Sequence, residues 1–577
     1  MKRLLSWLVF VSVASFFGQA RPAQANTNKS PGPSTVSVAV KENGCLRYVS
    51  QAAGSDSQGD GSKTKPWRSI AKAMEQSRGA SADEPCAILV AAGRYSCDEL
   101  KMQEYVDYYG GFDPASWERE IFRHPTVLDG NDRSRILVGA DHSKLDGFIV
   151  RRGLVRGRGA ALLCDGTSPT LTNNRFVENK TKKPIEWHPK ELHEIANDGG
   201  AICCLNGAKP DINSNIFADN RTEVGRGAAI AQHGRCGGVI AHNIFLDNET
   251  GTDDEHRSSD GGAISVFDWS SPRIENNVLL ENKARNTNDG GAIFVALWSS
   301  PVIIKNIFVG NRSTDDGGAL FIGGQEHRYS KPKDPVPDEE EFCVEVISNV
   351  FLGNENGARN SGGMRLAMDA RATLQNNIMA RDARLYVQDS AVEITNNTIL
   401  EETFFRDMSQ RSAESLIVNN ILWGLLTLPP ETSIGFCNVR DGYQGEGNIS
   451  EEPRFIQDQD RFPLASATYI PSEHSTAVRT PARQLANDEL AKRIVRADHR
   501  WGVVKSNQHD VISVWGDVSG EKELRVLPTF RLHSESPCID RGTMEDAPQQ
   551  DIHGDARPSG KGVDIGADEV TQVPITR

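Results

Sequence analysis

The chain contains two nearly identical segments placed 29 residues apart. They read SDGGAISVFDWSSPRIENNVLLEN, which ends at Asn282, and NDGGAIFVALWSSPVIIKNIFVGN, which ends at Asn311. Self-similarity at a fixed period of about 20 to 50 residues indicates a repeat architecture, because a unit of that size buries its apolar side chains only against copies of itself. This repeat restricts the possible folds more than any other feature of the chain.

Two phrases recur in register through the middle of the chain. Glycine-rich phrases followed by small and aliphatic residues begin at Gly199, Gly227, Gly261, Gly290, Gly317 and Gly362. Phrases such as NNRFVEN and HNIFLDN end at Asn179, Asn220, Asn248, Asn282, Asn311 and Asn354. Short runs of β-branched and aliphatic residues between Gly, Asn, Asp and Pro predict strands joined by turns, which excludes helical repeats.

Stacked units of three short strands predict a parallel β-helix. Each strand then pairs with its equivalent one coil away, at about 4.8 Å. We expect the Asn before each Ile-Phe or Val-Leu pair to hydrogen-bond its neighbours inside a turn. The glycines permit positive φ or a close approach of the backbone at another corner.

Composition and charge limit the class of protein and partner. The 577 residues are 38% hydrophobic and 25% charged, with a formal net charge of −14, which is typical of a soluble chain with a large core. The acidic balance argues against nucleic acid as a partner. After the N-terminus no apolar run approaches the ~18 residues of a membrane span, and we expect a monomer.

The N-terminus has the pattern of a secretory signal peptide. A basic start, MKR, precedes the apolar run LLSWLVFVSVASFFG and a small-residue cleavage signal, Ala23-Gln24-Ala25. Cleavage near Ala25 predicts a secreted protein in the extracellular space, at the cell surface or in the periplasm. Ten cysteines in an exported chain permit disulfides, and we expect Cys86 to pair with Cys97. Cysteines inside repeat strands are expected to be small buried hydrophobes, namely Cys203, Cys204 and Cys236.

The chain divides into five parts by pattern. An amphipathic segment with Ile70, Ala73 and Met74 on one face predicts a helix that covers the open end of the solenoid. The segment ARQLANDELAKRIVRADHRWG predicts a surface helix near residues 480–500. The predicted parts are a signal peptide (1–25), a flexible leader (26–44), an N-terminal cap with the first coils (45–135), regular coils (136–425), and irregular C-terminal coils with a cap and the helical insertion (426–577).

These motifs resemble those of the secreted right-handed parallel β-helix proteins of the pectin-lyase-like superfamily. The opening YVSQAAGSDSQGDGSKTKPWRSIAKAM is similar to the start of chondroitinase-B-like polysaccharide lyases. The GGAI and NIFxxN repeats resemble those of polymorphic outer membrane proteins, which are surface adhesins, and the ending SPCID to VDIGADE resembles extracellular β-helix proteins. The resemblance implies an all-β, right-handed solenoid and leaves the activity open.

The connections between the Asn phrases and the glycine corners vary most, and they should stack along one edge as a binding surface. Charged residues in these loops are candidates for chemistry. Candidate catalytic residues are His256, Arg257, His188 and His193, and candidate binding residues are Asp253 and Asp254. A uronic-acid lyase needs a base and a cation, and a hydrolase needs two carboxylates; these loops also fit the simpler alternative of solvated charge.

A row of carboxylates precedes the glycine corners at Asp198, Asp260, Asp289 and Asp316. Stacked carboxylates roughly 5 Å apart repel unless something compensates, and calcium is a possible cofactor because it takes several oxygen ligands. The favoured alternative is that each Asp accepts hydrogen bonds from backbone N–H groups of its own Gly-Gly turn.

Trp269 and Trp298 occupy equivalent places in the two WSSP segments and should lie one above the other. If exposed, they form a stacking platform suited to sugar rings; if they face inward, they are packing residues.

The leading hypothesis is an exported protein that binds polysaccharide or another cell-surface partner through the stacked loops. The alternative is an enzyme, a calcium-assisted polysaccharide lyase or, second to that, a glycoside hydrolase. A third possibility is a structural spacer with no preferred ligand.

Overall fold

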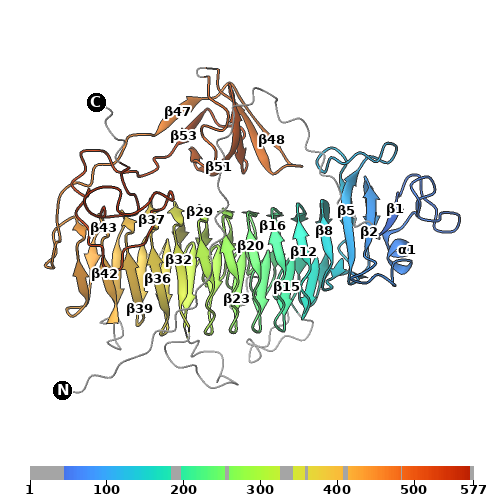
Figure 1. The fold of residues 1–577 in the computed structure, drawn as a ribbon, viewed down its shortest axis with the longest axis horizontal. Coiled ribbons are helices and arrows are strands. Elements are labelled where there is room, and N and C mark those ends of the chain that lie inside the picture. Colours follow the sequence, from blue (N-terminus) through green and yellow to red (C-terminus); the bar gives the residue numbers. More distant parts are fainter. Residues whose placement is uncertain are drawn as a thin grey trace.

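The computed structural model describes residues 44–183, 197–253, 259–324, 342–357, 362–406, 414–481 and 484–571. From Cys45 to Val439 the chain winds into a right-handed parallel β-helix, as predicted (Figure 1). The predicted signal peptide and nearly all of the predicted leader lie outside the described residues. Among the described residues, no helix is both long and apolar enough to span a membrane.

Four parallel sheets form the solenoid. Sheet A has 14 strands, from β1 (Cys45–Val49) to β45 (Ser433–Gly435), and sheet B has 13, from β3 (Gly93–Ser96) to β46 (Asn438–Val439). Sheet C has 12 strands, from β4 (Leu100–Lys101) to β44 (Leu426–Thr427), and sheet D has seven two-residue strands, from β10 (Leu154–Val155) to β34 (Glu355–Asn356).

One coil passes through sheets A, B, D and C in that order. In the repeat unit these strands are β24 (Arg273–Glu275), β25 (Val278–Leu280), β26 (Lys283–Ala284) and β27 (Ile293–Val295). β23 (Ile264–Phe267) pairs with β27 so that Ile264 lies opposite Ile293. The 29-residue repeat of the sequence is therefore one turn of the solenoid.

The interior is built from rows of equivalent side chains. Phe176, Phe217 and Phe245 are fully buried in successive coils, and their stacked rings have centroids 4.9 Å apart. The predicted asparagine ladder is confirmed at the turn between sheets A and B: Asn277 Nδ2 donates to Oδ1 of Asn306 in the next coil at 3.0 Å. A second ladder, which includes Asn282 and Asn311, runs between sheets B and D.

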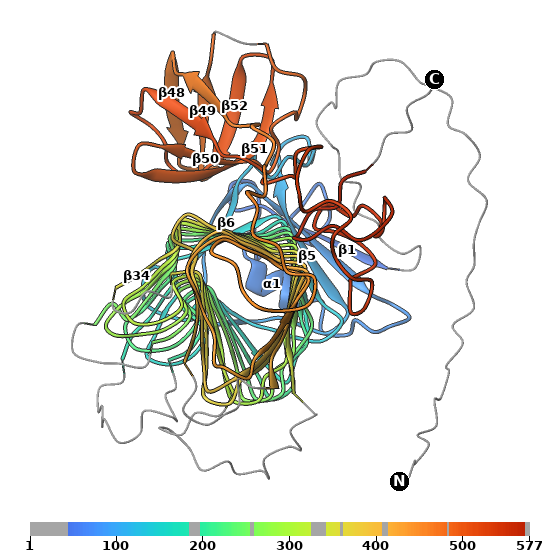
Figure 2. The ribbon, with the colours of Figure 1, turned by 90° about the vertical axis from the view of Figure 1, so that its left-hand side faces the viewer.

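Helix α1 (Ile70–Glu75) forms where the sequence predicts it, with Ile70, Ala73 and Met74 buried. These three side chains belong to the apolar core that continues through the solenoid. In the end-on view α1 lies within the outline of the coils (Figure 2).

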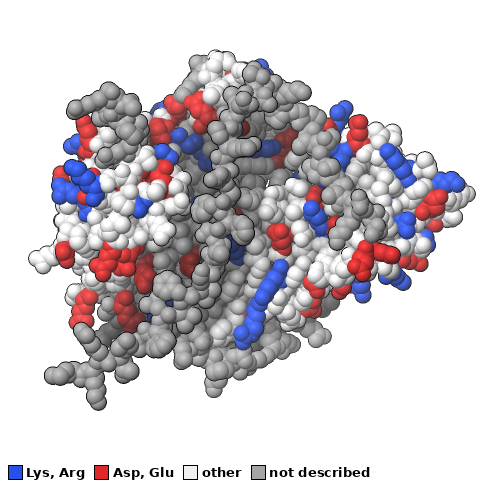
Figure 3. Space-filling model, in the orientation of Figure 1, with Lys and Arg blue, Asp and Glu red and all other residues white. Residues whose placement is uncertain are grey.

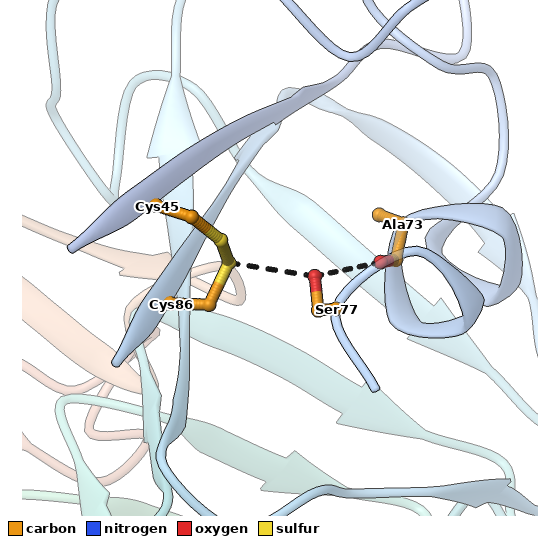
Figure 4. Close-up of a disulfide and its surroundings, with 4 residues drawn as sticks. All are labelled: Cys45, Ala73, Ser77 and Cys86. Carbon is orange, nitrogen blue, oxygen red and sulfur yellow. Dashed lines mark hydrogen bonds between the residues drawn. A yellow bond between two sulfur atoms is a disulfide. The ribbon is translucent and has the colours of Figure 1, made fainter. Parts of the chain in front are cut away.

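The predicted Cys86–Cys97 disulfide is wrong, because Cys86 pairs with Cys45 (Figure 4). β1 lies beside β2 (Cys86–Ala91) with Cys45 opposite Cys86, which places their Cα atoms 4.4 Å apart. Cys97 follows β3 of another sheet, and its thiol is free and buried, which raises its pKa to about 12. Ser77 Oγ lies 3.4 Å from Cys86 Sγ and donates to the Ala73 carbonyl, which joins the disulfide to α1. Cys203, Cys204 and Cys236 are buried, as predicted. Cys203 and Cys204 lie in a repeat strand, but the predicted strand position of Cys236 is wrong, because it lies in the turn after the strand Ile230–His233.

The helix predicted near residues 480–500 is also wrong. Its second half forms β50 (Ile494–Ala497), and the described residues before it make turns. The helix-forming residues are overruled by non-local strand pairing, since Ile494 and Val495 become buried by it. β50 belongs to a seven-stranded antiparallel sheet, here called the antiparallel domain; its other strands are β47 (Asp460–Pro463), β48 (Ser466–Ile470), β49 (Ser475–Arg479), β51 (Arg500–Gln508), β52 (Val511–Trp515) and β53 (Glu523–Val526).

The antiparallel domain lies over the outer face of sheet B (Figures 1 and 2). Side chains of sheet B such as Leu280 and Leu352 share one apolar cluster with Ile494 and Trp501 of the domain. Sheet B is thereby covered, whereas the outer face of sheet C is on a different side of the coil.

Candidate functional site

The variable loops leave sheet D and enter sheet C, so their bases lie along one edge. The two-residue strands of sheet D stack in register from β10 to β34, which confirms the predicted side-by-side arrangement for the described bases of these loops. Charged and aromatic side chains lie close together where this edge meets the outer face of sheet C.

A polar cluster occupies that face on three consecutive strands, β15 (Ile202–Leu205), β19 (Ile230–His233) and β23. Asp198 and Arg226 each precede a glycine corner, and Arg226 Nη2 contacts Asp198 Oδ2 at 3.0 Å. His233 lies between two carboxylates at ion-pair distances: its Nδ1 is 3.8 Å from Asp198 Oδ2 and its Nε2 is 3.5 Å from Asp268 Oδ2. We call these four residues the histidine cluster.

An aromatic residue supports the histidine cluster. Phe267 lies opposite His233 in the register, and its ring contacts the imidazole edge-on with centroids 5.3 Å apart. The Arg226 guanidinium lies 4.0 Å from the centroid of the same ring. Both cationic groups are thus held against an apolar surface as well as by carboxylates.

The charges of the histidine cluster fix its protonation. Burial would raise the pKa of Asp198, but the charges of Arg226 and His233 outweigh it and hold that pKa well below its usual range. Burial lowers the pKa of His233, yet the two carboxylates prevail and raise it overall. The interaction with His233 lowers the pKa of Asp268. The cluster therefore favours an imidazolium held between two carboxylates.

The two carboxylates differ in access to solvent. The Asp198 side chain is 2% exposed, and the Asp268 side chain is 40% exposed. Asp198 therefore serves as the buried partner of Arg226 and His233, and Asp268 is the member of the cluster that a ligand can reach.

The predicted row of aspartates is present but interrupted. Arg226 stands between Asp198 and Asp260, in the place that Asp198, Asp260, Asp289 and Asp316 hold in their copies. Asp260 Oδ1 accepts the backbone N–H of Asp289 at 2.9 Å, and Asp289 Oδ1 accepts that of Asp316 at 3.0 Å. These carboxylates thus bind backbone N–H groups, but the prediction that the donors belong to the Gly-Gly turn of each Asp itself is wrong for Asp260 and Asp289. Their donors belong to the next coil, because the stacked corners bring its backbone within reach.

The stacked carboxylates of this row remain strongly coupled. Burial raises the pKa of Asp260 to about 6, with Asp198 and Asp315 adding to the effect. Burial and the charges of Asp260 and Asp316 raise the pKa of Asp289 well above its usual range. Asp289, Asp315 and Asp316 each offer an oxygen within 4.8 Å of the others, a donor set that suits a hard cation such as calcium. Near neutral pH this row favours binding either protons or a cation.

Trp269 and Trp298 lie in adjacent coils, as predicted, with ring centroids 5.4 Å apart and planes inclined by 34°. Trp298 is 5% exposed and packs with Phe294 and Phe321, so it has the packing role. Trp269 is half-buried, and the exposed Arg235 lies over its ring at 5.1 Å. A ligand can therefore reach Trp269. The predicted platform of two exposed rings does not form, because Trp298 is buried.

The remaining candidates from the loops fall into two groups. Asp253 is described, and its carboxylate contacts Lys183 Nζ at 2.7 Å, which ties two loops together. The candidates Asp254, His256, Arg257, His188 and His193 lie outside the described residues.

Sequence reasoning missed Arg226, His233 and Asp268. A usable signal was present, because Arg226 replaces the aspartate found in both neighbouring coils, and His233 occupies the position of Phe267 one coil later. The positions at which the sequence departs from the repeat were therefore the ones that indicated site residues.

Comparisons with known proteins agree with the fold. Residues 157–329 match the family model for a right handed beta helix region. No curated protein matches this chain by sequence. Solved structures with some similarity include XylC in complex with xylose, at 10% identity and a TM-score of 0.38 over 92% of this chain and 98% of that chain.

Two further structures are similar to a lesser degree. Pectate lyase Pel9A has 13% identity and a TM-score of 0.32 over 92% of this chain and 97% of that chain. The tailspike protein gp49 of Acinetobacter baumannii bacteriophage Fri1, a capsular polysaccharide depolymerase, has 10% identity and a TM-score of 0.25 over 85% and 88%. At these values the similarity does not extend to an activity.

Proposed function

We propose that the protein is exported and binds a polysaccharide on the outer face of sheet C, at the solvent-facing side of the histidine cluster. One observation carries this proposal: the half-exposed Asp268 carboxylate, held by His233, directly precedes the half-buried Trp269, over which the exposed Arg235 lies. A carboxylate and a guanidinium that bond hydroxyl groups, beside an aromatic face, form a surface suited to sugars.

The solenoid also supplies the shape that a long polymer needs. Successive coils present equivalent positions at about 4.8 Å intervals, so an extended chain of sugars can follow the row of strands. Acidic and basic side chains are interspersed on the face seen in Figure 3. That face carries strands of sheet A in Figure 1, and its mixed signs give no broad electrostatic capture of a charged polymer.

Binding to a panel of neutral and acidic polysaccharides tests the proposal, with affinity electrophoresis as the readout. Asp268→Ala and Trp269→Ala should each weaken binding tenfold or more, because each removes a solvent-facing contact. The control is Asp211→Ala, which removes an exposed aspartate from sheet A. Wild-type binding to no polysaccharide, or equal binding by all variants, would refute the proposal.

The second candidate function is a polysaccharide lyase or hydrolase on the same face. It is favoured by protonation states that differ between neighbouring groups: the pKa is lowered at Asp268 and raised at His233, both in the histidine cluster, and it is raised at Asp260 of the aspartate row. Paired acid and base groups of this kind serve proton transfer. Ultraviolet absorbance of unsaturated uronic acid products, with calcium or a chelator, tests a lyase, and release of reducing ends tests a hydrolase.

Export rests on the signal-peptide pattern of residues 1–25. Expression with this segment should yield an extracellular or periplasmic protein that begins near Asn26. N-terminal sequencing of the processed chain is the direct measurement.

A further inference from the structure

A cavity of about 370 Å³ lies between the outer face of sheet B and the antiparallel domain. It is separate from the histidine cluster, which is on sheet C. Its volume is at the lower end of the usual range for small-molecule sites, which often form where two structural units meet.

One wall is an apolar strip. Ile307, Val350 and Ile378 line the cavity and hold equivalent positions on β29 (Ile307–Val309), β33 (Val350–Leu352) and β37 (Ile378–Ala380). Phe530 adds an aromatic wall near the antiparallel domain. This strip provides a surface for the apolar face of a ring.

Cationic side chains border the apolar strip. Lys305, Lys492 and Arg531 line the cavity, and among the described residues none of the three has a carboxylate at ion-pair distance. Arg493 also lines it, but its guanidinium is bound to Asp458 and to the Leu527 carbonyl. The cavity thus gathers several cationic side chains, in a chain whose net charge is −14. A carboxylate is also close, because Asp568 lies 3.5 Å from Nε2 of the lining residue His553 and its charge interacts with that of Arg531.

Both lysines have left-handed backbone. Lys305 has φ +56° and Lys492 has φ +64°. Lys305 aligns with Asn276 in one neighbouring coil and Ser348 in the other, which have φ +54° and +55°. The conformation of Lys305 therefore belongs to the turn between sheets A and B, and what distinguishes the position is its cationic side chain.

We propose that this cavity binds a carboxylated sugar, a single uronic acid unit. The ring lies on the strip formed by Ile307, Val350 and Ile378, and its carboxylate lies among Lys305, Lys492 and Arg531. A neutral sugar leaves the cations without a counter-charge, and an inorganic anion leaves the apolar strip unused. The proposal does not depend on the function proposed for sheet C.

Calorimetric titration with D-galacturonate tests it, with the uncharged methyl ester of the same sugar and inorganic sulfate as comparison ligands. We expect saturable binding of galacturonate that is at least fivefold tighter than that of either comparison ligand. Lys305→Ala and Lys492→Ala should each weaken it at least fivefold. Lys522→Ala, an exposed lysine of the antiparallel domain outside the cavity, should not change it.

A variant of the other surface separates the two proposals. Trp269→Ala should leave galacturonate binding unchanged, because Trp269 is on sheet C. Absence of binding by the wild type, or equal binding of the ester or of sulfate, overturns the inference. It is also overturned if Lys305→Ala and Lys492→Ala, with unfolding midpoints like that of the wild type, bind as tightly as the wild type does.

Discussion

At the scale of single residues, His233 determines the charge of the site on sheet C. Its carboxylate neighbours raise its pKa, so the folded protein holds the proton more tightly than the unfolded chain does. The resulting stability is fully present below the unfolded pKa of about 6.5 and is lost as pH rises through the folded value.

His233→Phe should remove this dependence, because phenylalanine already occupies the equivalent position at Phe267. Below about pH 6 the variant should be less stable, by roughly 1.4 kcal/mol for each unit by which folding raises the pKa of His233. The difference should shrink as pH rises toward 9. Denaturant unfolding of both proteins across this range measures it, and a difference that does not vary with pH would argue against a protonated His233.

Asp289 destabilises the folded protein at neutral pH, whereas protonated His233 stabilises it. Its folded pKa is raised well above its usual value, so the unfolded chain releases this proton first. The free energy of unfolding should therefore fall as pH rises from about 4 through the folded pKa.

Asp289→Asn should raise the unfolding midpoint at pH 8 in the presence of a chelator and leave it nearly unchanged at pH 4. The amide oxygen can still accept the Asp316 N–H, and the coupled negative charge is gone. If the row binds calcium, the ion should stabilise the wild type more than the variant. A variant that is less stable than the wild type at pH 8 with chelator would contradict the account of repelling carboxylates.

At the scale of structural elements, the docking of the antiparallel domain depends on one tryptophan. The Trp501 ring covers two glycines, Gly310 and Gly353, which directly follow strands β29 and β33 of sheet B. A Cβ added at Gly353 would lie 2.0 Å from Trp501 Cζ2. Gly353 has φ +62°, but Glu281 and Arg381 have similar left-handed backbone at equivalent positions of other coils. The space under the Trp501 ring is therefore what requires glycine there.

Gly353→Ala should displace the antiparallel domain and make it more sensitive to limited proteolysis, while the coils keep their resistance. Gly520→Ala is the matched control, because Gly520 also has positive φ but nothing lies within 4 Å of the added Cβ. Similar proteolysis of the two variants would mean that backbone strain, and not the contact with Trp501, explains the effect.

The disulfide fixes the first two strands of sheet A. Cys45 and Cys86 are 41 residues apart, and removal of a disulfide of this kind costs about 2–4 kcal/mol. The double change to alanine should lower the unfolding midpoint to that of the reduced wild type. Mass spectrometry of unreduced peptides should find Cys45 joined to Cys86; a peptide joining Cys86 to Cys97 would contradict the register of β1 and β2.

At the scale of the whole molecule, the features that could be predicted from the sequence are those that depend on contacts within one coil or between adjacent coils. The coils, the ladder through Asn277 and Asn306 and the buried face of α1 follow from periodic side chains that each interact with the next coil. The antiparallel domain has no repeat, and its strands pair across long separations, as β47 does with β53, so local patterns misidentified β50 as helix. The disulfide depended on strand register, which cysteine spacing does not encode.

The site followed the same rule. The row from Asp260 to Asp316 could be predicted because it repeats, whereas Arg226 and His233 could not be derived from a consensus that they break. The burial of Trp298 depends on Phe321 and Phe342 of later coils, which its own segment does not reveal.

The central claim is that a polysaccharide binds on the outer face of sheet C. Hydrogen–deuterium exchange with and without the tightest-binding polysaccharide of the panel tests it most directly, because a ligand slows exchange where it covers the backbone. Exchange should be slower in the peptides that contain His233 to Arg235 and Asp268 to Trp269. Protection confined to sheet A, or to the antiparallel domain alone, would contradict it.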